Sequence, residues 1–361
     1  MKRIIISVTT DISTDRRVLK VAQSCHNNGF EVLLVGRKLK NSIPLHLPFK
    51  YKRFRLLFNR SALFYAAYNI RLFFFLLFAK VDILLSNDTD SLPANYLVSR
   101  LRRKKLVFDA HELFPEVPEL ANRPKVKRFW EKIENAIFPH LKHCYTVCRS
   151  IADRYNKLYN INMQVVRNVP YTSNNNTEKL LDYSGKKVIL YQGALNIGRG
   201  LEWLIDAMPL VENAVFVIIG DGDIAHDLKV RVNNLNLNDK VFFLGRIAGS
   251  ELHKFTPSAD LGVCLLENRG LNYYYALPNR IFDFLHAGVP ILSTDFPEIS
   301  HIVGTLKTGI LIDHYEPEYL AKVVNDFFAQ GFDTSHFSEI VKQFCWEEEE
   351  KVVLEILQSG E

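Results

Sequence analysis

The stretch "FDAHELFPEVPEL" (108–120) contains residue types that could do chemistry. His111 and Glu112 follow an apolar run that ends at Asp109, and a proline-rich loop comes directly after them. A histidine beside carboxylates can move protons, bind a metal ion or fix the end of a strand by hydrogen bonds. The residue types alone leave these three roles open.

A second acidic group, "NDTD" (87–90), also follows an apolar run. Two acids separated by one residue, here Asp88 and Asp90, can contribute to a metal site, but acids alone rarely complete one. Acids at the end of a strand more often cap the helix that follows. We therefore expect helix capping here, and no metal or other cofactor.

The stretch "LYQGALNIGRGLEWLIDAM" (190–208) predicts a strand, a glycine-rich loop with Gly193, Gly198 and Gly200, and then a helix. Backbone N–H groups at a helix start bind phosphate, and Arg199 could add a bidentate cation. The spacing does not match G-x-G-x-x-G, which disfavours a nicotinamide-dependent dehydrogenase.

The stretch "ALPNRIFDFLHAGVP" (276–290) predicts a loop that enters a helix, with Asp283 about one turn inside it and Gly288 at its end. Amides at such a helix start can hold a diphosphate, and a nearby carboxylate can accept two hydrogen bonds from a ribose diol. A solvated acid on a helix surface is an equally good interpretation of this stretch alone.

Apolar strands that alternate with helical patterns must position these groups. The strand candidates are residues 3–8, 31–35, 82–86, 105–109, 143–147 and 163–167, and then 187–192, 214–219, 240–244, 260–265 and 289–293. Such a pattern is typical of parallel sheets with helices on both faces. It occurs twice, so we expect two doubly wound α/β domains facing a cleft, residues 1–170 and 171–340, with a polar linker over 171–187.

Charge is distributed unevenly over the chain. Residues 1–170 hold 30 Lys and Arg against 13 Asp and Glu, whereas the rest of the chain is net acidic. The first half should therefore attract an anionic ligand or surface. The apolar segment 61–85 follows the basic run 50–60, which allows either a buried helix or a helix lying on anionic lipid. No aromatic–basic recognition motif accompanies the charge, so we expect no nucleic-acid partner.

Cysteine usage and the first residues bear on the compartment. The five cysteines show no C-x-x-C pair, which favours reduced thiols in the core. The start, "MKRIIISVTT", has too short an apolar run for a signal peptide and predicts a first buried strand. We expect a cytoplasmic protein, peripheral at the inner face of the membrane.

In this order and spacing, these stretches resemble the retaining glycosyltransferases of family four, which have the GT-B fold of two Rossmann-like domains. The resemblance starts at residues 11–36 and also includes "VFFLGRI" (241–247). It implies transfer of a sugar from a nucleotide-sugar donor, UDP- or GDP-linked, to a glycan or lipid-linked acceptor in surface polysaccharide synthesis. It also implies that no metal is needed, and that the C-terminal helix (341–361) packs back on the first domain.

The resemblance assigns roles residue by residue. His111 matches the histidine beside the transferred sugar, and Arg199 matches the cation at the donor diphosphate, so both are candidate catalytic residues. The other positions that it matches to donor binding are Gly193, Arg246, Ile247, Leu277, Pro278, Asn279, Arg280 and Asp283. Candidate sugar or acceptor contacts are Asp88, Glu112 and Tyr275.

Two positions depart from the family pattern. Tyr275 stands where the family has the first acid of a pair, and Ala194 stands where it has an arginine. The first departure concerns the donor sugar, and the second leaves Arg199 and Arg280 to neutralise the diphosphate. Two other functions use the same fold: a nucleotide-sugar 2-epimerase and a non-catalytic nucleotide-sugar-binding protein.

Overall fold

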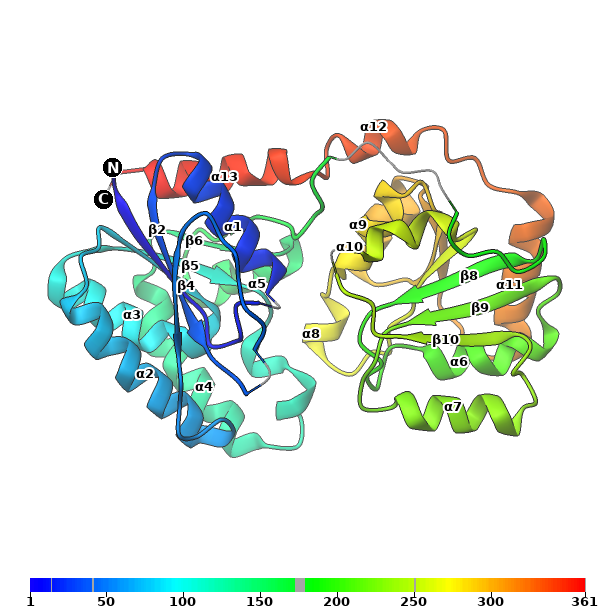
Figure 1. The fold of residues 1–361 in the computed structure, drawn as a ribbon, viewed down its shortest axis with the longest axis horizontal. Helices are drawn as coiled ribbons and strands as arrows, with labels where there is room; N and C mark the ends of the chain where they lie inside the picture. Colours follow the sequence, from blue (N-terminus) through cyan, green and yellow to red (C-terminus); the bar gives the residue numbers. More distant parts are fainter. Residues whose placement is uncertain (14, 41, 173–178, 250, 361) are drawn as a thin grey trace. The chain divides into compact units, whose positions relative to one another are not determined.

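The computed structural model describes residues 1–361 except 14, 41, 173–178, 250 and 361. The chain forms two compact units (Figure 1). The first comprises Met1–Asn168 and Glu348–Glu361, and the second comprises Val169–Glu347. Part of the expected linker, 173–178, lies outside the described residues.

The first unit contains a seven-stranded sheet in which every pair of neighbours is parallel. Its strands are β1 (Arg3–Ser7), β2 (Glu31–Arg37), β3 (Lys50–Phe54), β4 (Ile83–Asn87), β5 (Lys105–Ala110), β6 (Cys144–Thr146) and β7 (Gln164–Val165). Their order is β3-β2-β1-β4-β5-β6-β7. The order reverses between β1 and β4, the point at which doubly wound sheets bind ligands beyond the carboxyl ends of their strands.

The helices of the first unit are α1 (Arg16–Asn27), α2 (Ser61–Phe78), α3 (Asp88–Arg102), α4 (Pro124–Ile137), α5 (Arg149–Tyr159) and most of α13 (Trp346–Gln358). Helix α2 packs one face on the sheet through Phe64, Tyr68, Leu72 and Leu76, next to Ile5 and other strand residues. The opposite face of α2 is exposed, and 22% of the helix Ser61–Phe78 is buried.

The second unit contains a six-stranded parallel sheet, again with one reversal of strand order, between β8 and β11. Its strands are β8 (Lys187–Gln192), β9 (Ala214–Ile219), β10 (Val241–Gly245), β11 (Leu261–Cys264), β12 (Ile291–Thr294) and β13 (Gly309–Ile312), in the order β10-β9-β8-β11-β12-β13. Its helices are α6 (Leu201–Ala207), α7 (Ala225–Asn234), α8 (Leu271–Tyr274), α9 (Asn279–His286), α10 (Pro297–Ser300), α11 (Pro317–Gln330) and α12 (Phe337–Val341).

Strand β8 shows why the central strands are apolar almost throughout. Ile189 and Tyr191 pack with α6, α7 and α11, whereas Val188 and Leu190 pack with α9 and α12 on the other face. Successive side chains of a strand point to opposite faces, so a sheet covered on both faces needs apolar residues at every position. Helices lie on both sides of this sheet in Figure 1.

Two strands escaped the sequence analysis, and both lie at the edge of a sheet. Strand β3 reads "KYKRF" and pairs only with β2, so three of its five side chains are exposed. Charged side chains are common on edge strands, where they discourage pairing with other chains. Strand β13 pairs only with β12 and is mostly half-buried.

Candidate functional site

In the first unit, His111 lies between two carboxylates just beyond the carboxyl end of β5. Its backbone N–H donates to Asp88 Oδ1 at 2.8 Å, and its Nδ1 is 3.2 Å from Asp88 Oδ2. On the other side, Nε2 is 3.2 Å from Asp109 Oδ2, outside the geometry of a hydrogen bond. Asp88 adopts a left-handed backbone (φ 56°) at the first position of α3. The backbone hydrogen bond to Asp88 and the carboxylate beside each ring nitrogen therefore position the ring of His111.

Arg17 completes this group from α1. Its Nε donates to Asp109 Oδ2 at 2.9 Å and its Nη2 donates to Oδ1 at 2.8 Å, while Nη1 donates to the Val166 carbonyl at 2.8 Å. Both side chains are buried, with exposed fractions of 3% and 0%. A buried carboxylate with two cationic neighbours stays ionised because the charges compensate its lost hydration.

The charges of this cluster fix its protonation. Burial alone would lower the pKa of His111, but the charges of Asp88 and Asp109 outweigh it and raise that pKa to about 10. Burial would raise the pKa of Asp109, but Arg17 and His111 hold it at about 2. At neutral pH, His111 is therefore a charged hydrogen-bond donor, and it cannot act as a general base.

The acids of "NDTD" do not cap the helix, which corrects the sequence prediction. The N-cap residue of α3 is Asn87, without a side-chain capping bond. Asp88 binds His111 instead, and Asp90 accepts a hydrogen bond from Thr9 Oγ1 at 2.5 Å. Burial and the nearby charge of Asp88 raise the pKa of Asp90 to about 8. Both acids lie where the strand order reverses, so they belong to the ligand side of the sheet.

In the second unit, the glycine-rich loop follows β8 as expected. Gly193, Gly198 and Gly200 have φ values of 143°, 81° and 64°. A Cβ on Gly200 would lie 2.5 Å from the Cβ of Leu265, so the loop approaches the chain after β11 too closely for a side chain. Since β8 and β11 flank the reversal of strand order, the loop lies where this sheet should bind a ligand.

Two arginines lie beside this loop with N–H groups unused. Arg199 stacks on Tyr273, with 5.0 Å from its Cζ to the ring centre, and Arg280 stacks on Tyr191 at 4.4 Å. Arg199 Nε and Arg280 Nη1 are buried but have no hydrogen-bond partner within the described part of the chain. A buried unpaired N–H costs free energy, so the two groups are suited to an anionic ligand.

Both guanidinium charges act on the end of β11. Burial raises the pKa of the Cys264 thiol at the end of β11, while the positive charges of Arg280 and Arg199 oppose that rise. A Cβ on Gly193 would lie 3.6 Å from Arg280 Cζ. The glycine-rich loop and the end of β11 therefore lie in the positive field of these arginines.

Asp283 lies in α9, one turn from its start, as the sequence predicted. Its Oδ2 accepts from Gln192 Nε2 at 3.2 Å, and Gln192 Oε1 accepts from Thr256 Oγ1 at 2.9 Å. This chain of hydrogen bonds fixes the carboxylate beside the glycine-rich loop. A fixed carboxylate can accept two hydrogen bonds from a diol.

The remaining candidates lie in loops of the second unit. Arg246 and Ile247 follow β10, with Arg246 exposed and Ile247 packed against the core. Leu277 and Pro278 are half-buried before α9, and Asn279 is exposed at its first position. Tyr275 is the C-cap residue that follows α8. In the first unit, Glu112 is half-buried, and its carbonyl accepts from Tyr155 Oη at 3.3 Å.

Several groups that hold these sites could not be identified from the sequence alone. Arg17 binds Asp109, Gln192 binds Asp283 and Thr256 binds Gln192, each across at least 64 positions of the sequence. Arg17 and Gln192 stood in stretches already singled out, 11–36 and 190–208, whereas Thr256 did not. In the ranges that the structure describes, no three His, Cys, Asp or Glu side chains are grouped to hold a metal ion. All five cysteines are buried thiols.

Two family models match this chain. Residues 14–170 match Glycosyltransferase Family 4, and residues 172–344 match Glycosyl transferases group 1. An uncharacterized glycosyltransferase of Methanocaldococcus jannaschii is 27% identical over 45% of this chain and 42% of its own length. The alpha-monoglucosyldiacylglycerol synthase of Streptococcus pneumoniae is 25% identical over 37% of this chain and 30% of its own. The chain thus spans less than half the length of these two relatives.

Longer matches cover nearly the whole chain. The chitobiosyldiphosphodolichol beta-mannosyltransferase of Yarrowia lipolytica is 23% identical over 86% of this chain and 76% of its own. Among solved structures, Anabaena HepE in complex with UDP and glucose has a TM-score of 0.76 at 15% identity, covering 100% of both chains. The sucrose-phosphate synthase of Thermosynechococcus elongatus has a TM-score of 0.75 at 17% identity, covering 99% and 98%. The fold is GT-B, and the chain belongs to the group 1, family four glycosyltransferases.

Proposed function

We propose that this chain is a retaining glycosyltransferase that moves a sugar from a UDP- or GDP-linked donor to a glycan or lipid-linked acceptor in surface polysaccharide synthesis. The observation that carries the proposal is the pair of arginines, Arg199 and Arg280, with unpaired buried N–H groups beside the glycine-rich loop. A donor diphosphate would satisfy both, and Asp283 would accept hydrogen bonds from the ribose hydroxyls.

The same arginines would act on the reaction. Breaking the bond between the sugar and the diphosphate leaves negative charge on the departing phosphate. Positive groups already in place stabilise that charge as it develops, without reorganisation of water. Two arginines supply this charge, so we propose that transfer needs no metal ion.

Retention is proposed to follow a same-face route. The acceptor hydroxyl attacks from the side on which the phosphate leaves, and the leaving phosphate takes the acceptor's proton. His111 is charged at neutral pH, so it would donate a hydrogen bond to a sugar hydroxyl rather than remove a proton. The names of the relatives include one alpha-glucosyl and one beta-mannosyl enzyme, so the product anomer must be measured.

A donor screen tests this function. UDP- and GDP-sugars are offered with glycan and lipid-linked acceptors, release of UDP or GDP is followed, and the anomeric configuration of the product is read by NMR. Acceptor-dependent release with retained configuration is expected. Epimerisation of a UDP-sugar without acceptor would make the chain a 2-epimerase, and tight UDP binding with intact donor throughout would make it a binding protein.

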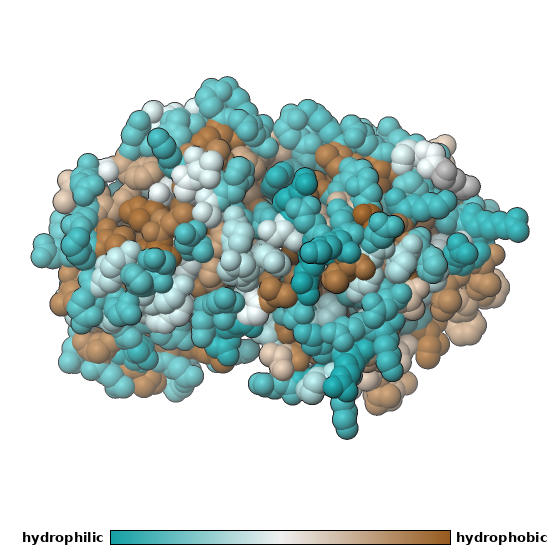
Figure 2. Space-filling model, turned by 180° about the vertical axis from the view of Figure 1, so that it is seen from behind, coloured by the Kyte–Doolittle hydropathy of each residue, from teal (hydrophilic) through white to brown (hydrophobic). Residues whose placement is uncertain are grey.

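Helix α2 supports a peripheral position at the inner face of the membrane, in the cytoplasm. Its 18 residues have a mean hydropathy of 1.5, enough by length and composition for a membrane span, but its buried face belongs to the core. The exposed face carries Leu63, Ile70, Phe74 and Phe78, with exposed fractions of 56–80%. Figure 2 shows apolar side chains along the lower right edge of the first unit. An apolar helix face at the surface is suited to the lipid interface.

Cations beside this face would favour anionic lipid, although fewer are available than the sequence indicated. Arg53 is 3.6 Å from Asp11 and Lys50 is 3.8 Å from Glu31, so both already have carboxylate neighbours. Flotation with anionic liposomes at low salt should recover the wild type. Phe74→Glu with Phe78→Glu should remain unbound, whereas Phe129→Glu, at an exposed site on α4, should bind normally. No wild-type binding would refute the membrane proposal.

A further inference from the structure

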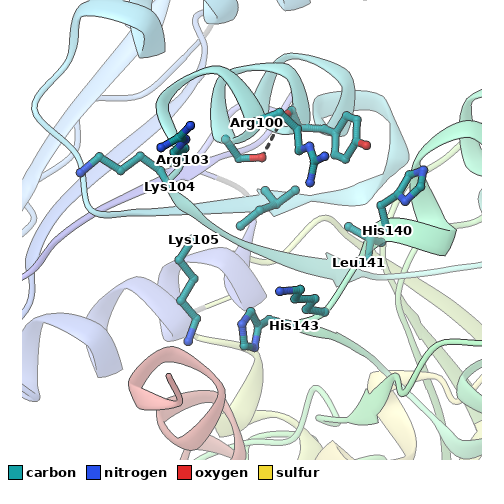
Figure 3. A pocket seen from close by; sticks show the side chains of 11 residues that line it. Arg100, Arg103, Lys104, Lys105, His140, Leu141 and His143 are labelled. Carbon is teal, nitrogen blue, oxygen red and sulfur yellow. Dashed lines mark hydrogen bonds between the residues drawn. The ribbon is translucent and has the colours of Figure 1, made fainter. Parts of the chain in front are cut away.

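The first unit has a cavity of about 470 Å³ at the end of the sheet opposite His111. It is lined by Tyr96, Ser99, Arg100, Arg103, Lys104, Lys105, Leu106, His140, Leu141, Lys142 and His143 (Figure 3). Lys105 begins β5, whereas His111 follows its other end. Strand residues rise about 3.3 Å each, so β5 separates the cavity from His111 by roughly 17 Å. The cavity is a separate site.

Its lining is cationic, with five Lys and Arg residues, two histidines and no carboxylate. Arg100, Arg103 and Lys142 form no ion pair in the portion of the chain that the structure describes. Lys104 lies 3.6 Å from Asp82. Burial, together with the positive charges of Lys105 and Lys142, lowers the pKa of His143. Like charges gathered around one cavity repel one another until an anion joins them.

Lys105 has a different role from the other cations. Its Nζ donates to the carbonyls of Ile356 and Ser359, both at 2.6 Å, at the end of α13. In Figure 3 it points toward that helix. A cation at a helix end satisfies carbonyls that have no partner in the helix. The other cations of the lining do not bind the end of α13.

We propose that this cavity binds a small ligand rich in phosphate groups. Arginine guanidinium groups match phosphate oxygens in a bidentate way, and the volume lies within the range of small-molecule sites. Of the eleven lining residues only Tyr96, Leu106 and Leu141 offer large apolar or aromatic surface, which disfavours an apolar ligand.

The phosphate groups can come from a soluble oligophosphate or from the head group of an anionic lipid. The second source is consistent with the geometry, because the cavity adjoins the helix proposed to contact lipid. Arg102 Nη1 donates to the carbonyls of Leu76 and Ala79 at 2.7 and 2.6 Å. These bonds join the end of α3, which bears Arg100 and Arg103, to the end of α2, where Phe78 is exposed. The proposed site does not depend on the reaction proposed above.

Calorimetric titration of the full chain with tripolyphosphate at low salt tests the proposal. The wild type should bind, and Arg100→Gln with Lys142→Gln should weaken binding about tenfold or more, since each lost cation removes charge-assisted hydrogen bonds. The matched control is Lys125→Gln with Arg128→Gln, which removes two exposed cations from α4 in the same unit. It should change affinity by less than roughly twofold. A donor site in the second unit contributes equally to all three proteins.

A second arm identifies the source of the phosphate. The same three proteins are sedimented with phosphatidylcholine vesicles that contain or lack phosphatidylglycerol. Loss of binding in the cavity variant alone, with tripolyphosphate or with phosphatidylglycerol vesicles, supports the site and names its source. If neither probe binds the wild type, or if the control variant loses as much affinity as the cavity variant, the proposal fails.

Discussion

The two sites at the strand ends of this molecule differ in whether their cations are paired with carboxylates. In the first unit, Arg17 and His111 are neutralised by Asp109 and Asp88 within 3.2 Å. In the second unit, Arg199 and Arg280 have buried N–H groups without a hydrogen-bond partner among the described residues. The net charges of the two halves show the opposite trend: the half with the neutralised site is basic, and the half with the unpaired cations is acidic. The net charge of a domain therefore does not reveal the charge of its site.

Asp109→Asn should break the compensated site most severely. The side chain is fully buried between two cations, and removing one partner of a buried ion pair commonly costs about 3–5 kcal/mol of unfolding free energy. Urea denaturation followed by circular dichroism measures the loss. Asp153→Asn, at a surface pair with Arg149, is the control and should leave the midpoint unchanged. An unchanged midpoint in Asp109→Asn would show that the cluster contributes nothing to stability.

Arg199→Ala should have the reverse effect, with activity lost and stability kept. Removing a group that stabilises the departing phosphate commonly lowers kcat by about 100- to 1000-fold. Turnover and thermal unfolding are measured on the same preparation. Arg231→Ala, which loses only a surface pair with Asp206, should turn over normally. Normal turnover in Arg199→Ala would remove this residue from the reaction.

The pH dependence of stability distinguishes the two sites further. The folded pKa of His111, about 10, lies above its ordinary value of 6.5. The stabilisation from its charge is therefore complete below about pH 6.5 and is lost as the pH rises through about 10. Wild type should lose unfolding free energy more steeply over this range than His111→Ala, which should also abolish transfer. Parallel curves for the two proteins would contradict the charged state of His111.

Thr256→Val should give the smallest effect, on donor binding. Its hydroxyl holds Gln192, which in turn holds Asp283. Losing one such hydrogen bond costs about 1 kcal/mol, so KM for the donor should rise roughly fivefold with kcat nearly unchanged. Thr256→Ser keeps the hydroxyl and should restore KM. A fall in kcat instead would show that this chain of hydrogen bonds stabilises the transition state and not only the bound donor.

The sequence predicted the central strands well because burial on both faces demands apolar residues. It missed β3, since "KYKRF" at a sheet edge carries the charges of a surface segment. The glycine-rich loop and α9 were also predicted, because glycine at positive φ and a proline before a helix act locally. These features depend only on neighbours in the chain.

The compensated cluster could not be predicted in the same way. Arg17 and Asp109 are 92 residues apart, and only the order of strands brings α1 beside the end of β5. Asp88 looked like a capping residue because its partner, His111, lies 23 positions away. Pairing across the fold therefore decided the roles of these acids, and local pattern did not.

Helix α13 has a consequence for dissecting the gene. Glu349 pairs with Arg167 at 2.9 Å, Glu350 accepts from Ser24, and Lys105 holds the last carbonyls. A recombinant fragment stopping at residue 168 would lose all three contacts and expose the surface against which Val353 and Leu357 are buried. To express the first unit alone, the segment 348–361 must be supplied, fused or as a separate peptide. Residues 169–347, by contrast, form the second unit as one continuous segment of the chain.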